Sequence, residues 1–120
     1  MFKNVTHDII TAGTTTGVAE LSRMTEKEVV GYNDAFNSGI TNTSNCFFFN
    51  RLKVKVEGKG EGAKIMAEVA TILKLLDLSV ILVVNPYGNM GLDCLIGFYK
   101  KYNFKLIEKF NREALMTYGN

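Results

Sequence analysis

Residues 51–66 read Arg-Leu-Lys-Val-Lys-Val-Glu-Gly-Lys-Gly-Glu-Gly-Ala-Lys-Ile-Met. Apolar and basic side chains alternate through the first part, which places Leu52, Val54 and Val56 on one face of a predicted strand. The three alternating glycines that follow predict a turn. Apolar side chains recur at helical spacing over residues 65–76, so a helix is expected after the turn.

The glycine-rich turn is a candidate phosphate-binding loop. Gly58, Gly60 and Gly62 have no Cβ atom that would keep a phosphate away from the backbone N–H groups. The start of the following helix offers further N–H groups and the positive end of a dipole, and Lys59 adds a charge. The spacing matches neither the Walker loop nor the dinucleotide-binding fingerprint. A pyrophosphate is therefore the expected ligand, and the alternative is a turn that binds nothing.

The other segments predict an α+β fold of mixed layers. A helix is expected to begin after Thr25, because Glu28 completes a capping-box pattern three residues later, and to end before Gly39. Asn103 is expected to end a later helix in the left-handed conformation. A turn is predicted at 13–17, strands at 18–24, 46–56, 80–84, 104–110 and 114–118, and a further helix at 92–102. From residue 46 the order is β-α-β-α-β-β.

Composition limits the class of protein. The chain has 120 residues, of which 47% are hydrophobic and 22% charged, as expected for one globular domain. The longest apolar run, residues 80–84, is too short to cross a membrane. Two cysteines exclude a four-cysteine zinc site, and no cluster of metal ligands is present, so no metal is expected. The first residues do not form a secretory signal, which favours the cytoplasm.

Two motifs in order resemble the GNAT superfamily of N-acetyltransferases. One is the strand and glycine-rich loop of residues 51–66, and the other is Phe98-Tyr-Lys-Lys-Tyr-Asn-Phe104, with the buried strand between them. In that family the loop after the strand binds the pyrophosphate of acetyl-CoA, and a later helix carries a tyrosine. The resemblance implies a mostly antiparallel mixed sheet flanked by helices in one domain, residues 1–120. Residues 46–120 would form the acetyl-CoA-binding core, and residues 1–45 a short acceptor-side segment.

The resemblance assigns roles residue by residue. Gly60 and Gly62 match the two loop glycines, the strand offers backbone groups to the pantetheine arm, and a nearby asparagine can supply an amide. The implied cofactor-binding residues are Val54, Val56, Gly58, Lys59, Gly60, Glu61, Gly62, Ala63 and Asn85. Tyr99 matches the helix tyrosine, which would act as the general acid that protonates the departing thiolate. The alternative for Tyr99 is a plain core residue.

Three departures from the family pattern keep alternatives open. Glu57 stands where the family usually has Arg or Gln, and Leu92 where it often has Asn. The strand carries no glutamate as general base, so proton removal falls to a water chain, to Glu20 or Glu28, or to no group if the amine arrives neutral. A non-catalytic domain that binds CoA or a partner is therefore one alternative.

The main functional prediction is acetyl transfer from acetyl-CoA to a primary amine of a small molecule, a peptide N-terminus or a lysine. Residues 1–50 carry three basic and five acidic side chains, and this excess of acid would suit a cationic acceptor. Residues 51–120 carry eleven basic and seven acidic ones. An enzyme that modifies nucleic-acid bases is a second alternative, since basic side chains could contact phosphates. These are Arg51, Lys53, Lys100, Lys101 and Lys105. A homodimer that pairs the final strands is expected by resemblance only.

Overall fold

The computed structural model describes residues 1–55, 60–86 and 90–119. In this part a mixed sheet has the strand order β1-β2-β3-β4-β5-β7-β6. Only β4 and β5 are parallel, so the predicted mostly antiparallel α+β architecture is confirmed. The elements are β1 (Phe2–Val5), β2 (Ile9–Thr14), β3 (Gly17–Arg23), α1 (Glu26–Phe36), the 3-10 turn η1 (Thr43–Asn45), β4 (Cys46–Val54), α2 (Glu61–Leu75), β5 (Ser79–Val84), α3 (Leu92–Lys100), β6 (Lys105–Phe110) and β7 (Glu113–Tyr118).

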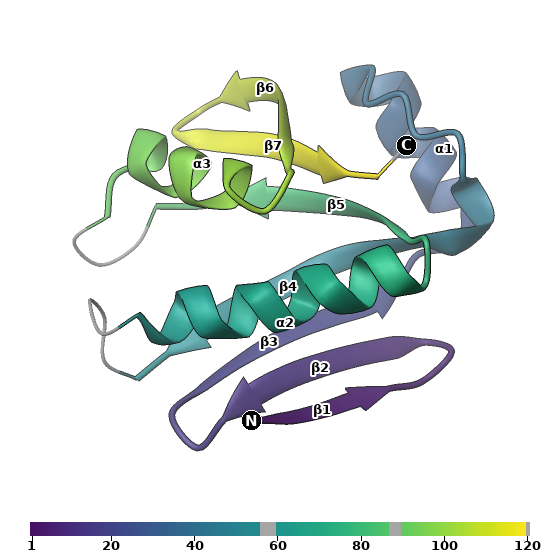
Figure 1. Cartoon of the computed structure of the whole chain (residues 1–120). Helices are drawn as coiled ribbons and strands as arrows, with labels where there is room; N and C mark the ends of the chain where they lie inside the picture. Colours follow the sequence, from purple (N-terminus) through teal and green to yellow (C-terminus); the bar gives the residue numbers. More distant parts are fainter. Residues whose placement is uncertain (56–59, 87–89, 120) are drawn as a thin grey trace.

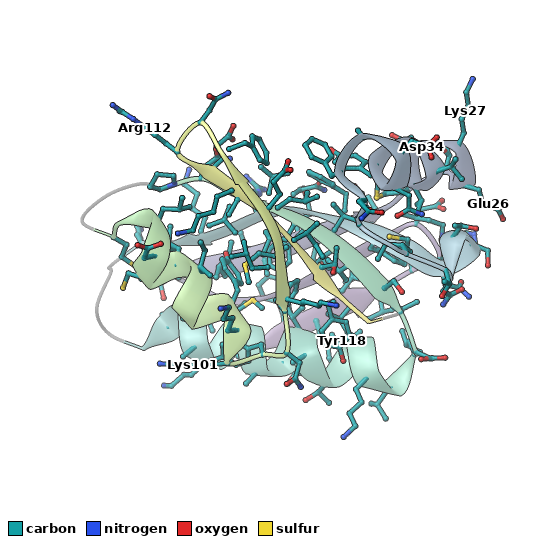
Figure 2. All side chains as sticks on the ribbon, turned by 90° about the horizontal axis from the view of Figure 1, so that it is seen from above. Glu26, Lys27, Asp34, Lys101, Arg112 and Tyr118 are labelled. Atoms are coloured by element: carbon teal, nitrogen blue, oxygen red, sulfur yellow. The ribbon has the colours of Figure 1, made fainter. Side chains whose placement is uncertain are left out.

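The sheet has a hydrophobic cluster on each face. Helices α2 and α3 cover one face over a core that includes Phe49 and Val69, and α1 covers part of the other over Val29 and Ile81. Figure 2 shows α1 on the opposite side of the sheet from α2. Strand β5 lies between the two clusters and is buried on both faces, as its uninterrupted apolar sequence predicts. Among the described residues, no helix has the length and apolar character needed to cross a bilayer.

Local signals placed several element ends correctly. Thr25 and Glu28 form the predicted capping box at the start of α1. Asn103 adopts the predicted left-handed conformation, with φ 68°, although α3 itself ends at Lys100 rather than at residue 102. Helix α1 ends before Gly39, as predicted, and Asn37 takes the left-handed cap position with φ 56°.

Strand β1 has no counterpart among the predicted elements. Its four residues are all exposed, so its sequence carries no alternation of buried and exposed positions. It forms because it pairs with β2 in an antiparallel register that sets Phe2 opposite Gly13. Gly13 tolerates no larger residue, since a Cβ atom there would lie 2.4 Å from the Gly17 carbonyl oxygen.

Candidate functional site

Strand β4 is bent by a β-bulge in its middle. In the ladder with β3, Glu20 pairs with Arg51 and Leu21 pairs with Phe49, so Asn50 is the extra residue. The bulge reverses the faces of the strand, and Phe49 before it and Leu52 after it therefore pack into the same core cluster. The predicted alternation of residues 51–56 therefore does not continue through the bulge to Phe49.

Strands β4 and β5 separate after Phe48, two residues before the bulge. Their parallel pairing runs from Cys46 opposite Ser79 to Phe48 opposite Ile81, whereas β5 stays paired with β7 as far as Val84. Figure 1 shows the two strands diverging toward the end of the sheet where α2 and α3 begin. The carboxyl halves of the two parallel strands thus form the sides of an open wedge.

A cleft of about 320 Å³ occupies this wedge. This volume is within the range of small-molecule sites. Tyr99 and Leu95 line it from α3, and Asn85 lines it just beyond β5. The exposed side chains of Arg51 and Lys53 give it a positive rim. The remaining lining residues are Phe49, Asn50, Leu52, Leu82, Val83 and Val84.

Tyr99 combines burial with a place on the cleft wall. The residue is only 6% exposed, and its ring makes edge contacts with the rings of Phe49 at 6.1 Å and Phe104 at 5.8 Å. Phe98 makes a third edge contact at 5.2 Å. These contacts fix the ring while the residue still lines the cleft, so the two interpretations of Tyr99, core residue and site residue, both describe part of its environment.

The start of α2 has the geometry of an anion site. Gly60 has φ 74°, a conformation that glycine adopts without strain, and a Cβ atom there would meet nothing within 4 Å. The first helical hydrogen bond runs from the Lys64 N–H to the Gly60 carbonyl at 3.1 Å. The N–H groups of Glu61, Gly62 and Ala63 precede it and have no partner within the helix. They lie at the positive end of the helix dipole.

Three side-chain hydrogen bonds tie this helix start to its neighbours. The hydroxyl groups of Thr14 and Thr16, at the β2–β3 turn, both donate hydrogen bonds to Oε1 of Glu61, the second at 2.9 Å. The Tyr102 hydroxyl, beyond α3, donates to the Ala63 carbonyl at 3.2 Å. The Glu61 carboxylate is therefore engaged by threonines of the neighbouring turn. Hydrogen bonds from Thr14 and then Thr16 hold the pKa of Glu61 below its ordinary value.

The lowered pKa of Glu61 predicts a specific dependence of stability on pH. A carboxylate whose folded-state pKa is depressed stabilises the fold above its unfolded pKa and loses that contribution as the pH falls through the folded value. We expect the free energy of unfolding of the wild type, measured in urea, to fall more steeply than that of Glu61→Gln between about pH 5 and pH 3. Parallel curves for wild type and Glu61→Gln would contradict the role of the threonine contacts.

The predicted site residues fall into three groups. Gly60, Glu61, Gly62 and Ala63 gather at the start of α2, and Asn85 and Tyr99 lie in the cleft. Val54 lies elsewhere, beside the β2–β3 turn, where it lines a separate hollow with Lys55. Val56, Gly58 and Lys59 lie outside the described residues, as does Glu57.

Sequence reasoning missed Asn50, which forms the bulge and lines the cleft. A signal was present in the sequence: the core-facing apolar residues have odd numbers at 47 and 49 but even numbers at 52 and 54. One extra residue between them explains this shift. Of the two candidate bases, Glu20 accepts a long hydrogen bond of 3.5 Å from Asn50 Nδ2. Glu28 lies on the α1 side of the sheet, where it lines two other cavities. Over the described residues, no three His, Cys, Asp or Glu side chains form a group that could hold a metal ion.

Comparisons based on sequence find no relatives. No family model matches the chain, and no curated protein matches it. Any similarity to known proteins therefore has to come from the three-dimensional arrangement of the elements described above.

Solved structures with the same fold are found. NAA60 of Arabidopsis thaliana, in complex with acetyl-CoA, superimposes with a TM-score of 0.62 at 15% identity, over 95% of this chain and 77% of that one. PaiA N-acetyltransferase of Thermoplasma acidophilum, in complex with coenzyme A, gives 0.58 at 18% identity, and the match covers 94% of this chain but only 62% of PaiA.

A third structure is of similar length. The anti-CRISPR protein AcrVA5 superimposes with a TM-score of 0.61 at 15% identity, over 93% of this chain and 99% of its own. This fold is therefore also found in a solved structure of about this length. At these identities the likeness concerns the fold, and the resemblance to GNAT N-acetyltransferases is confirmed at that level: the chain has the α+β fold of this superfamily.

Proposed function

We propose that this protein is an N-acetyltransferase that transfers the acetyl group of acetyl-CoA to a primary amine. The observation that carries the proposal is the wedge between β4 and β5, which opens beside the start of α2 and has Tyr99 in its wall. The structures of NAA60 with acetyl-CoA and of PaiA with coenzyme A, which share the fold, support acetyl-CoA as the cosubstrate.

The residues present fit acetyl-CoA. The N–H groups of Glu61, Gly62 and Ala63 would bind the pyrophosphate, and Gly60 leaves the approach open because it has no side chain. The thioester arm would enter the cleft beside β4, where the ladder to β5 has ended and backbone groups can bind a ligand. Arg51 and Lys53 add positive charge along the rim, and Asn85 adds an amide at the end of β5.

The chemistry needs few groups from the protein. The neutral amine nitrogen attacks the carbonyl carbon of the thioester, a C–N bond forms, and the C–S bond breaks as the oxyanion collapses. A backbone N–H of β4 would stabilise the oxyanion. The Tyr99 hydroxyl would give its proton to the departing sulfur, and the nitrogen would lose its extra proton to water. None of the described residues that line the cleft is a glutamate, so the amine is taken to arrive neutral at the reacting carbon.

The test is calorimetry followed by an acceptor screen on the full chain. We expect saturable binding of acetyl-CoA and of CoA, and amine-dependent release of the CoA thiol when primary amines are added. Absence of binding at millimolar concentration would reject the proposal. Binding with no thiol release for any amine would favour the alternative of a non-catalytic CoA-binding domain. Steeply salt-dependent binding of nucleic acid would favour the base-modifying alternative.

A further inference from the structure

Two cavities lie on the α1 side of the sheet, opposite α2 and α3. One, of about 280 Å³, is mostly polar and is lined by Ser22, Glu28 and Asn50 among others. The second, of about 450 Å³, is apolar and is lined by Tyr32, Phe36, Val83 and Phe110, with Glu28 at its edge. Neither is part of the proposed acetyl-CoA site, and α1, which forms a wall of both, contributes nothing to that site.

Shared lining residues join these cavities to the cleft between β4 and β5. Asn50 lines both the cleft and the polar cavity, and Val83 lines both the cleft and the apolar cavity. Glu28 and Tyr32 line both cavities on the α1 side. The wedge between the strands therefore has cavities on both faces of the sheet, and a molecule held against α1 would approach the wedge from the face opposite to α2.

The polar cavity favours a cation. Glu28 Oε1 accepts a hydrogen bond from the Thr25 N–H at 2.9 Å, which leaves lone pairs of the carboxylate for a ligand. Hydrogen bonding to Thr25, chiefly from its backbone N–H, holds the pKa of Glu28 below its ordinary value, so the group stays ionised. Arg23 also lines this cavity, but its guanidinium donates to the carbonyls of His7 at 2.6 Å and Ser44 at 2.8 Å.

The apolar cavity favours an uncharged, apolar group in the remainder of the ligand. The ring of Phe36 stacks on Tyr32 at 5.9 Å and on Phe110 at 5.4 Å, which makes a continuous aromatic wall. Among the described residues that line the apolar cavity, the ionisable side chains are the Tyr32 phenol and the Glu28 carboxylate. Glu28 lies at the boundary with the polar cavity. Figure 2 shows the Lys27 side chain on the side of α1 that faces away from the sheet.

From this arrangement we infer that the acceptor is a small primary amine carried on an apolar chain or ring. Its ammonium group binds beside Glu28 and Asn50, and its apolar part fills the cavity walled by Tyr32, Phe36 and Phe110. The inference rests on the proposed function, because it names the substrate class of the same reaction. Glu28 acts here by binding the ammonium and not as the base, since a carboxylate with a lowered pKa is a weak base. The bound ammonium gives its proton to water as it leaves Glu28, so that the nitrogen reaches the thioester in the neutral form that the proposed reaction requires.

The test compares primary amines of equal length. Hexylamine is apolar throughout its chain, 5-aminopentanol ends in a hydroxyl, and pentane-1,5-diamine ends in a second ammonium. We expect hexylamine to bind at least about ten-fold more tightly than either polar amine, measured by ligand-observed NMR without acetyl-CoA. With acetyl-CoA, kcat/KM from thiol release should follow the same order. Equal or tighter binding of the diamine, or better turnover of a lysine-containing peptide, would overturn the inference.

Two variants locate the site. A Cβ atom at Gly31, which lines the apolar cavity, would meet nothing within 4 Å, so Gly31→Leu should fold and place an apolar side chain at the rim of the cavity, where it would obstruct the ligand. We expect it to lose hexylamine binding about ten-fold or more, while Gly31→Ala loses far less. Glu28→Gln, which preserves the capping box, should raise KM for hexylamine without changing acetyl-CoA affinity. Unchanged amine binding in both Gly31→Leu and Glu28→Gln would refute the assignment.

The two readouts separate the inference from the proposed function. If hexylamine binds selectively but is never acetylated, the transferase proposal fails and the amine site stands. If acetyl-CoA binds and amines are acetylated without preference for apolar chains, the transferase proposal stands and the inferred substrate class is wrong.

Discussion

Replacing Gly60 with aspartate is expected to weaken acetyl-CoA binding by about a hundred-fold or more. The side chain would project beside the start of α2, where the pyrophosphate is proposed to bind, and its carboxylate would compete for the same N–H groups and repel the phosphates. The protein should still fold, since a Cβ atom at Gly60 meets nothing within 4 Å and aspartate tolerates φ values near 74°. Calorimetric titration with acetyl-CoA measures the loss.

Gly60→Asn is the matched control for this variant. Asparagine has nearly the same shape as aspartate and the same tolerance of the left-handed conformation, but it carries no charge. We expect it to lose about ten-fold or less in affinity, so that the difference between the two variants reports the repulsion of the phosphates. Thermal unfolding curves show whether both proteins are folded. If they are, and wild type and Gly60→Asp bind acetyl-CoA with equal affinity, the pyrophosphate binds elsewhere.

Much of the fold could be predicted because its signals are local. The capping box at Thr25, the left-handed Asn103 and the tight turn at Asn111 and Arg112 each depend on a few adjacent residues. Both turn residues have positive φ, 46° and 71°, which closes the predicted β6–β7 hairpin. Likewise, the uninterrupted apolar run of β5 predicts a strand covered on both faces.

The features that were missed depend on pairing between distant segments. Strand β1 exists only through its ladder with β2. The bulge at Asn50 is defined by the register with β3, some thirty residues earlier, as in the pairing of Glu20 with Arg51. A single sequence does not specify such a register, even where it shows a change in the phase of the apolar positions.

In the candidate site, too, the residues in local motifs could be predicted and those brought together by distant pairing could not. Its motif residues, Gly60, Gly62 and Tyr99, could be picked out because each lies within a short recognisable segment. The cleft between β4 and β5, and the cavities under α1, could not, because Asn50, Val83 and Glu28 come together only through the sheet order. Acceptor specificity is therefore the part of the function that most needed the structure.

Replacing Tyr99 with phenylalanine is expected to lower kcat by about a hundred-fold while acetyl-CoA affinity stays close to that of the wild type. The ring keeps its edge contacts with Phe49 and Phe104, so only the hydroxyl is removed from the wall of the cleft. If the hydroxyl protonates the departing thiolate, its loss acts on the transition state rather than on the binding of acetyl-CoA. Rates of thiol release with a saturating amine, together with calorimetry, separate these two effects.

The pH dependence of kcat distinguishes an acid from a packing residue. An acid must carry its proton to act, so the wild-type rate should fall at alkaline pH as the hydroxyl ionises, and Tyr99→Phe should lack this decrease. Tyr118→Phe removes a hydroxyl from a tyrosine that is not among the lining residues of the cleft, and it should leave kcat and the pH profile unchanged. If Tyr99→Phe keeps kcat within about two-fold of the wild type, Tyr99 is a core residue only. Since the thiol of CoA is a good leaving group, the reaction could then proceed with the oxyanion contact alone.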